Sequence, residues 1–476
     1  MKLHLRFFGI MVSMCLAMAA GARAQGHQHQ HEPESGDAQK LGRVVFPTSC
    51  SAEAQQDFNR AVAMLHSFWY PAAEKAFAEL VQREPACGMA YWGVAMSRFH
   101  PLWTKLSPAD VEAGQAALEK ARARVKTERE RDYVNALARM YENADKVEHL
   151  ARLQAYEKAM EEVQRKHADD SEAAIFYALS LLGTAYWSPA DKTYARQKKA
   201  GAILEKIFVQ QPNHPGVAHY IIHSYDYPPL AEQALPAARA YAKIAPDAPH
   251  ALHMPSHIFT RRGYWQESIA SNQASAASAH KYNWVGQELH AMDYLTYAYL
   301  QGAQDDEARK MQERLSELQK GVNGDFAGLY GAAASPSRYA VERRQWKEAA
   351  ALPVPEGVFR GGATCWAEAT LYFARGLGAA RTGDAAGARE AIQQLERCRE
   401  ALAAANDKLW GAQVDVQRGV VAAWLALAEG KKDEALAQMR ATADLEDGTD
   451  KHPVTPGAVV PARELLGEML LELKRP

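Results

Sequence analysis

A pattern of one small residue, two larger packing residues and a proline recurs along this chain at the spacing of a helical repeat. Three copies are clear: Ala73, Phe77, Leu80 and Pro85; Ala200, Leu204, Ile207 and Pro212; Ala234, Ala238, Tyr241 and Pro246. The second and third copies are offset by 34 residues at every position. A small residue lets two helices approach closely, residues three or four apart share one helix face, and proline ends the helix. Such a pair of helices cannot bury its face alone, so the pattern predicts a stack of pairs.

Looser copies of this pattern centre on Ser268, Ala308, Ala349, Ala388 and Ala435. With them the chain resembles the tetratricopeptide repeat superfamily over most of residues 50–476. The resemblance implies an all-α fold, a right-handed α-α solenoid of tandem helix pairs with one continuous core and a concave groove. It also implies a non-enzymatic scaffold that binds a protein or peptide partner in that groove.

The N-terminus has the composition of an export signal. Lys2 and Arg6 precede an apolar run from 7 to 20, and small residues at Ala22 and Ala24 suit cleavage before Gln25. The Gln- and His-rich stretch that follows has nothing with which to build a core. These observations divide the chain into a signal peptide (1–24), a disordered His/Gln-rich tail (25–42) and a helical solenoid (43–476). We therefore expect a periplasmic or secreted protein.

Charge and hydropathy exclude two classes of partner. Removing residues 1–24 takes away Lys2, Arg6 and Arg23, which leaves 52 basic against 57 acidic residues. Nucleic-acid-binding proteins usually carry a basic excess, so we expect no nucleic-acid partner. After the signal, no apolar stretch reaches the roughly 20 residues that a membrane span needs.

Four cysteines remain after cleavage, and an exported chain with an even number invites disulfides. Cys50 precedes the first helix of its predicted pair, and Cys87 follows the second. Cys365 and Cys398 hold nearly the same places in a later pair. Antiparallel helices bring those ends together, so we predict the disulfides Cys50–Cys87 and Cys365–Cys398.

The 17 histidines are unevenly distributed, and four of them repeat with the helix pairs. His219 and His223 are four residues apart and so share a helix face, as do His253 and His257. The two pairs are separated by 34 residues, so they occupy equivalent places in consecutive repeats. Pro255 lies inside the predicted helix of the second pair and should kink it.

The resemblance implies that the second, fifth, ninth and twelfth places of each first helix line the concave groove. Counting from the alanine register places the following residues there: His219, His223, Asp226, His250, His253, His257, His290 and Asp293. Packing would require apolar side chains at repeated places, so a histidine patch that recurs with the repeat indicates a ligand that contacts both repeats.

Two kinds of ligand suit this patch. Imidazoles hydrogen-bond well to a peptide or an acidic segment, which favours the scaffold function. The alternative is a transition-metal site. Neighbouring helices pack about 8–10 Å apart, so His219, His223, His253 and His257 can converge on one ion. Imidazole suits Zn, Cu and Ni, and Met254 would favour Cu if it turned inward. The tail residues His27, His29 and His31 are a second, weaker metal-binding feature.

A metal-dependent hydrolase is the third alternative, with Asp226 as the base that activates a metal-bound water. The chain lacks the HExxH and GxSxG motifs, a P-loop and a CxxCH haem site. We therefore predict that it is not an enzyme. His66 and His100 each stand alone, and we expect them to be hydrogen-bonded structural residues.

Overall fold

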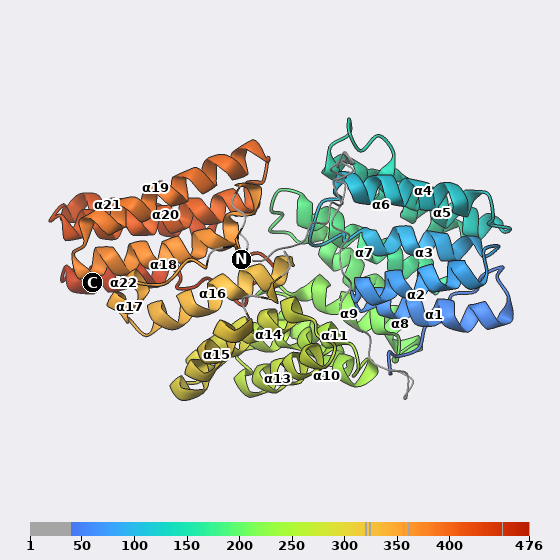
Figure 1. The fold of residues 1–476 in the computed structure, drawn as a ribbon, viewed down its shortest axis with the longest axis horizontal. Coiled ribbons are helices and arrows are strands. Elements are labelled where there is room, and N and C mark those ends of the chain that lie inside the picture. The colour runs from blue at the N-terminus through green and yellow to red at the C-terminus, as the bar shows by residue number, and fades with distance from the viewer. Residues whose placement is uncertain are drawn as a thin grey trace, which may run out of the picture.

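The structure, a computed structural model, describes residues 40–318, 321–322, 325–355, 357–359, 362–449 and 451–475. The predicted signal peptide and almost all of the predicted tail lie outside these residues. The described residues form helices and contain no strand, which confirms an all-α helical repeat. Figure 1 shows a curved array, with α1–α9 at one end, α10–α15 in the middle and α16–α22 at the other end.

The helices follow one another along the chain in short antiparallel steps. In the first part they are α1 (Ala52–His66), α2 (Tyr70–Arg83), α3 (Gly88–Arg98), α4 (Pro108–Arg122), α5 (Glu128–Tyr141), α6 (His149–Lys166), α7 (Ser171–Trp187), α8 (Ala195–Gln210) and α9 (Pro215–Tyr225). The middle part holds η1 (Ala231–Ala234), α10 (Leu235–Ile244), α11 (Pro249–His253), α12 (Pro255–Arg262), α13 (Trp265–Lys281), α14 (Val285–Gln301) and α15 (Asp305–Leu318). The last part holds α16 (Phe326–Glu342), α17 (Trp346–Ala350), η3 (Gly362–Thr364), α18 (Trp366–Thr382), α19 (Ala385–Ala404), α20 (Lys408–Ala428), α21 (Lys432–Asp447) and α22 (Ala462–Glu472).

The repeated pattern of the sequence marks the second helix of a pair. In α2 the small and packing residues Ala73, Phe77 and Leu80 are at most 2% exposed, and the helix ends just before Pro85. α8 and α10 repeat this arrangement and end before Pro212 and Pro246. The proline that follows each of these helices therefore sets its end, and burial of its apolar face drives the stacking of the helix pairs.

The hydrophobic core is divided, which corrects the expectation of one continuous core. One large apolar cluster runs from Leu41 to Phe259 and a second from Leu329 to Met469, with two small clusters between them. The physical reason lies in the middle of the array, where polar side chains take buried positions. α13 buries Ser268, Asn272 and Ser275 where other second helices bury apolar residues.

Residues just before the predicted boundary at 43 already pack against the helices. Leu41 is only 4% exposed, and the Arg43 N–H donates to the carbonyl of Asn213. Both predicted cysteine pairs lie at disulfide distance, with Cα separations of 4.9 Å for Cys50–Cys87 and 5.6 Å for Cys365–Cys398. Within the described residues, no helix is long and apolar enough to cross a membrane.

Candidate metal centre

Six of the eight predicted groove residues are histidines, and they lie on first helices of three consecutive pairs. The helices carry them as follows: His219 and His223 on α9, His250 and His253 on α11, His257 on α12, and His290 on α14. The predicted break at Pro255 is present, because α11 ends at His253 and α12 begins at Pro255. Despite that break, His253 and His257 still face each other, with their Nε2 atoms 3.0 Å apart.

These side chains form two groups of three, and each group offers ring nitrogens that lie within 4.8 Å of one another. The first histidine cluster is His219, His223 and His250, and the second histidine cluster is His253, His257 and His290. The sequence analysis placed the two i, i+4 pairs around a single ion. In the structure each pair instead takes its third member from the following first helix, because the second-place residue of that helix lies beside the preceding pair.

In the second histidine cluster, hydrogen bonds determine which nitrogen carries the proton. His257 Nδ1 lies 3.0 Å from Oδ2 of Asp226, and an ionised carboxylate can only accept. His253 Nδ1 lies 2.7 Å from Oδ1 of Asn272, whose amide orientation follows from Nδ2 donating to the Ser268 carbonyl. Both Nδ1 atoms are therefore donors, and in neutral rings both Nε2 atoms carry lone pairs.

The two Nε2 lone pairs of the second cluster thus face each other across 3.0 Å in a fully buried site. Protonation of one ring would relieve the repulsion, but burial lowers the pKa of both His253 and His257. A metal ion would also relieve it. Two imidazoles bound tetrahedrally with bonds of about 2.0–2.1 Å have nitrogens about 3.3–3.4 Å apart, a few tenths of an ångström from the spacing seen here.

The first histidine cluster is arranged similarly, with the proton position of His219 fixed in the same way. His219 Nδ1 lies 2.6 Å from the backbone carbonyl of His66, which can only accept, so its Nε2 carries a lone pair. That atom lies 3.1 Å from Nε2 of His223. His250 Nδ1 lies 3.4 Å from Oε1 of Gln287, whose Nε2 in turn donates to Ser275. In His219, His250, His253 and His257, one ring nitrogen is held by a backbone or side-chain oxygen, the usual support for a metal-ligating histidine.

The third member of each cluster has a ring nitrogen without a partner. His250 Nε2 and His290 Nδ1 are buried and make no hydrogen bond within the described part of the chain. A buried polar atom without a partner costs free energy, on the order of 1–3 kcal/mol. The lone pairs of these two nitrogens are therefore available to bind a metal ion.

All six histidines are buried, and burial keeps them neutral. The pKa of the other members, His219, His223, His250 and His290, is held well below its ordinary value of 6.5, first by desolvation and then by neighbouring histidines. Neutral imidazole is the form that binds a metal ion. At neutral pH the whole set is therefore ready to bind without losing protons.

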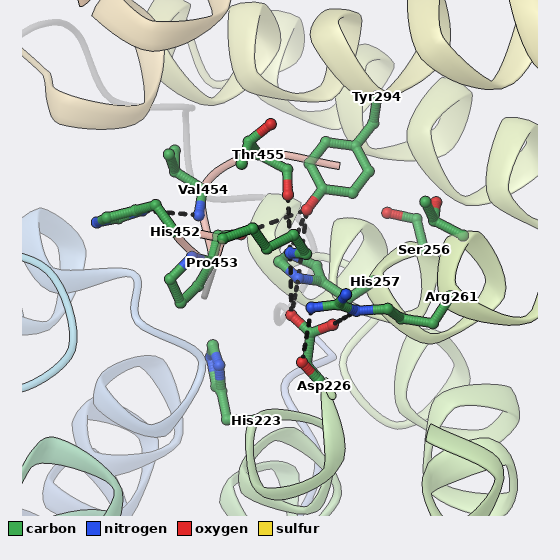
Figure 2. A network of polar contacts seen from close by, with 12 residues as sticks. His223, Asp226, Ser256, His257, Arg261, Tyr294, His452, Pro453, Val454 and Thr455 are labelled. Atoms are coloured by element: carbon green, nitrogen blue, oxygen red, sulfur yellow. Dashed lines mark hydrogen bonds and ion pairs between the residues drawn. The ribbon is translucent and has the colours of Figure 1, made fainter. Parts of the chain in front are cut away.

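Asp226 joins the second cluster to the C-terminal part of the chain. Figure 2 shows its carboxylate between His257, Arg261 and the segment 451–461. Arg261 Nε donates to it over 2.8 Å, and Lys451 Nζ lies 3.6 Å away. Burial alone would raise the pKa of Asp226, but Lys451, Arg261 and His257 together hold it well below its ordinary value. The same burial lowers the pKa of Lys451 to about 7.

A third group, the acid cluster of His66, Glu172 and His214, also has three potential ligands within 4.8 Å. Here every ligand atom already has a partner. His66 Nε2 and His214 Nε2 each lie 2.9 Å from one oxygen of Glu172. His66 Nδ1 meets the Tyr220 hydroxyl at 3.0 Å, and His214 Nδ1 accepts from the Val217 N–H. His66 is thus a hydrogen-bonded structural residue, as predicted.

The concave side holds a cavity of about 1660 Å³ lined by residues from α7, α9, α12, α16, α20 and the segment 451–461. Of the six clustered histidines, only His223 belongs to its lining. The other five of these predicted groove residues are buried and do not line this cavity. The segment 451–461 packs against residues beside the second histidine cluster. Its Pro453 carbonyl accepts from Tyr294, and its Gly457 and Ala458 carbonyls accept from Arg338.

Asp293, the eighth predicted groove residue, serves the structure instead. It is fully buried and lies 3.3 Å from Nε of Arg338, which is also fully buried. The sequence analysis did not identify Glu172, His214 or Lys451. No local motif marks these residues, because the charged partners in these contacts lie between 42 and more than 200 positions away along the chain.

The fold and the site together define an all-helical repeat protein with buried histidine clusters. No protein-family model matches the chain, and no curated protein matches it. Among solved structures it is similar to the TPR domain of P58(IPK), at 13% identity over 89% of this chain and 100% of that one, with a TM-score of 0.23. Yeast Tom70 aligns at 10% identity over 88% and 89%, with a TM-score of 0.37. Naa15/Naa10 bound to HypK-THB aligns at 14% identity over 89% and 67%, with a TM-score of 0.27. The fold assignment rests on this chain's own helices.

Proposed function

We propose that this protein binds two transition-metal ions, one in each histidine cluster. The observation that carries the proposal is the pair of Nε2 lone pairs of His253 and His257, which face each other at 3.0 Å with both Nδ1 protons committed elsewhere. A bound cation turns this repulsive contact into two metal–ligand bonds. The partnerless nitrogens of His250 and His290 support a third ligand for each ion.

The ligand set selects the kind of metal. Three neutral imidazoles suit Zn²⁺, Cu²⁺ and Ni²⁺, whereas Mg²⁺ and Ca²⁺ require oxygen ligands. Met254 is fully buried in the first large hydrophobic cluster, so it does not favour copper over zinc. Zinc or copper therefore fits both clusters.

The test counts bound ions by native mass spectrometry after Zn²⁺ or Cu²⁺ loading. All forms carry alanine at His27, His29 and His31, so that the tail contributes no binding. The parent should bind two ions, and His250→Leu and His290→Leu should each bind one. His149→Leu is the matched control, because His149 is also buried, and within the described residues neither of its ring nitrogens has a partner.

The proposal fails if the parent binds no ion, or if His149→Leu loses as much metal as the cluster variants. It also fails if the His250→Leu, His290→Leu double variant still binds two ions. The last result would place the metal on residues outside the two clusters.

Protein or peptide binding remains a second proposal. The size of the concave cavity supports it, and so does an aromatic lining that includes Trp187, Trp366 and Trp410.

Export also remains a proposal, and two cysteine pairs at disulfide distance support an oxidising compartment. The absence of catalysis stays a prediction, as does the hydrolase alternative. Pull-down of partners by the folded exported protein, and its loss with Trp410→Ala, would test the peptide proposal.

A further inference from the structure

The two histidine clusters differ in what can reach them. No member of the second cluster lines the cavity, and Tyr294 covers it, with the hydroxyl 3.3 Å from Nδ1 of His257. The first cluster meets the cavity at His223. Trp103 lines the cavity at the same place, and its ring lies 5.1 Å from that of His250. The first cluster is therefore accessible to a molecule inside the cavity.

Resting on the metal-binding function, we propose that the ion in the first cluster keeps a coordination position open to the cavity and takes there an aromatic ligand with an anionic oxygen donor. Such a ligand is an aromatic carboxylate or a phenolate. Its oxygen binds the ion, and its ring lies against Trp103.

The number of protein ligands leaves a coordination position free at this ion. The first cluster supplies three protein ligands among the described residues, and zinc sites with three protein ligands use the fourth position for water or a small molecule. Aromatic rings also pack against the cluster. Phe68 lies 4.3 Å from the ring of His219, and Tyr241 stacks on it at 5.2 Å. A small molecule can approach from the cavity, which His223 borders.

Charge determines where in the cavity an anion can lie. At the histidine end, Arg261 and Lys451 both neutralise Asp226, so a divalent ion in the first cluster would make that end positive. Carboxylates outnumber amines over the rest of the lining, where Glu148, Asp191 and Asp407 are examples. An anionic group is therefore drawn to the ion and repelled elsewhere.

The side chain beside the coordination site favours a ligand with an aromatic ring. Trp103 is half-buried and makes edge contacts with Phe68 and His250, which hold its ring in place. A rigid aromatic wall beside a coordination site favours a flat ring over a short aliphatic chain, both by burial and by ring–ring contact. A carboxylate without a ring would make only the bond to the ion.

The test uses the full chain with alanine at His27, His29 and His31, loaded with Co²⁺, whose visible spectrum reports a change of ligand. Benzoate should change the spectrum and saturate at one molecule per chain, with about tenfold tighter binding than acetate, equal to about 1.4 kcal/mol. Trp103→Ala should lower the benzoate affinity to that of acetate while two Co²⁺ ions remain bound. His250→Leu should abolish the benzoate response, and His290→Leu should keep it.

The possible failures can be told apart. Two bound Co²⁺ ions without a benzoate response would overturn the open position and leave the metal-binding function intact. Equal affinities for benzoate and acetate would overturn the aromatic ligand. A response that survives His250→Leu would overturn the assignment to the first cluster. A chain that takes up no Co²⁺, Zn²⁺ or Cu²⁺ would overturn both this inference and the proposed function.

Discussion

The second histidine cluster and the acid cluster have similar burial and similar size, but they differ in how their ring nitrogens are satisfied. In the acid cluster, Glu172 accepts from His66 and His214, so each N–H meets an oxygen. In the second histidine cluster, the corresponding nitrogens of His253 and His257 meet each other with lone pairs. A count of potential ligands within 4.8 Å does not separate the two groups. The proton positions do, because of these two groups only the second histidine cluster sets one ring lone pair against another.

Acid should produce the largest effect, and it separates the six histidines of the two histidine clusters from the carboxylate of the acid cluster. Burial holds the pKa of the six clustered histidines below 6.5, so the unfolded chain takes up protons first as the pH falls below that value. Each histidine that stays neutral in the folded state then lowers the free energy of unfolding by about 1.4 kcal/mol at pH 5.5, and six lower it by at most about 8 kcal/mol. Urea unfolding of the metal-free protein should show this loss between pH 7.5 and 5.5.

The carboxylate of the acid cluster should respond in a lower pH range, whereas His66, whose pKa burial also lowers, joins the loss below 6.5. Burial would raise the pKa of Glu172, but His214 and His66 lower it to about 2. Its contribution is therefore present above about 4.5 and is lost as the pH falls from there toward 2. Zinc should move the first loss to lower pH, because it holds the histidines deprotonated. A flat stability between pH 7.5 and 5.5 would contradict the neutral state of the histidine clusters.

Removing the carboxylate of the acid cluster should have the next largest effect. Glu172→Ala leaves two buried ring N–H groups without an acceptor, which costs about 2–6 kcal/mol of unfolding free energy at pH 7.5. Glu172→Gln keeps one acceptor and should lose about half as much. Both variants should still bind two zinc ions in native mass spectrometry. Loss of an ion from Glu172→Gln would mean that this group is also a metal site.

Removing a histidine from the second cluster should have the smallest effect on stability. His290 is 4% exposed, and its Nδ1 has no partner in the described chain, so His290→Leu gives up little hydrogen bonding in the metal-free protein. We expect the free energy of unfolding to change by less than about 1 kcal/mol. Without zinc, His149→Leu should change the free energy of unfolding as little as His290→Leu does. With zinc, only His290→Leu should lose part of the stabilisation that zinc gives to the parent protein. A loss above about 3 kcal/mol in metal-free His290→Leu would give this histidine a structural role.

The sequence predicted the repeat, both cysteine pairs and the histidines that the structure brings together, because each depends on spacing along the chain. The 34-residue step sets the equivalent places of His219 and His253, and the helix ends bring Cys50 to Cys87. The grouping into threes depends on how one helix pair tilts on the next, and spacing does not encode that tilt. Burial of the second cluster was also beyond prediction, because the segment 451–461 returns from the far end of the chain to contact Tyr294.

The central claim concerns where ions bind, and anomalous X-ray scattering from crystals grown with Zn²⁺ measures this directly. Data collected on either side of the zinc absorption edge should show two peaks per chain. One peak should lie among His219, His223 and His250, and the other among His253, His257 and His290, with none at Glu172. A peak between Glu172 and His66, or no peak at either histidine cluster in crystals soaked to saturation, would contradict the account.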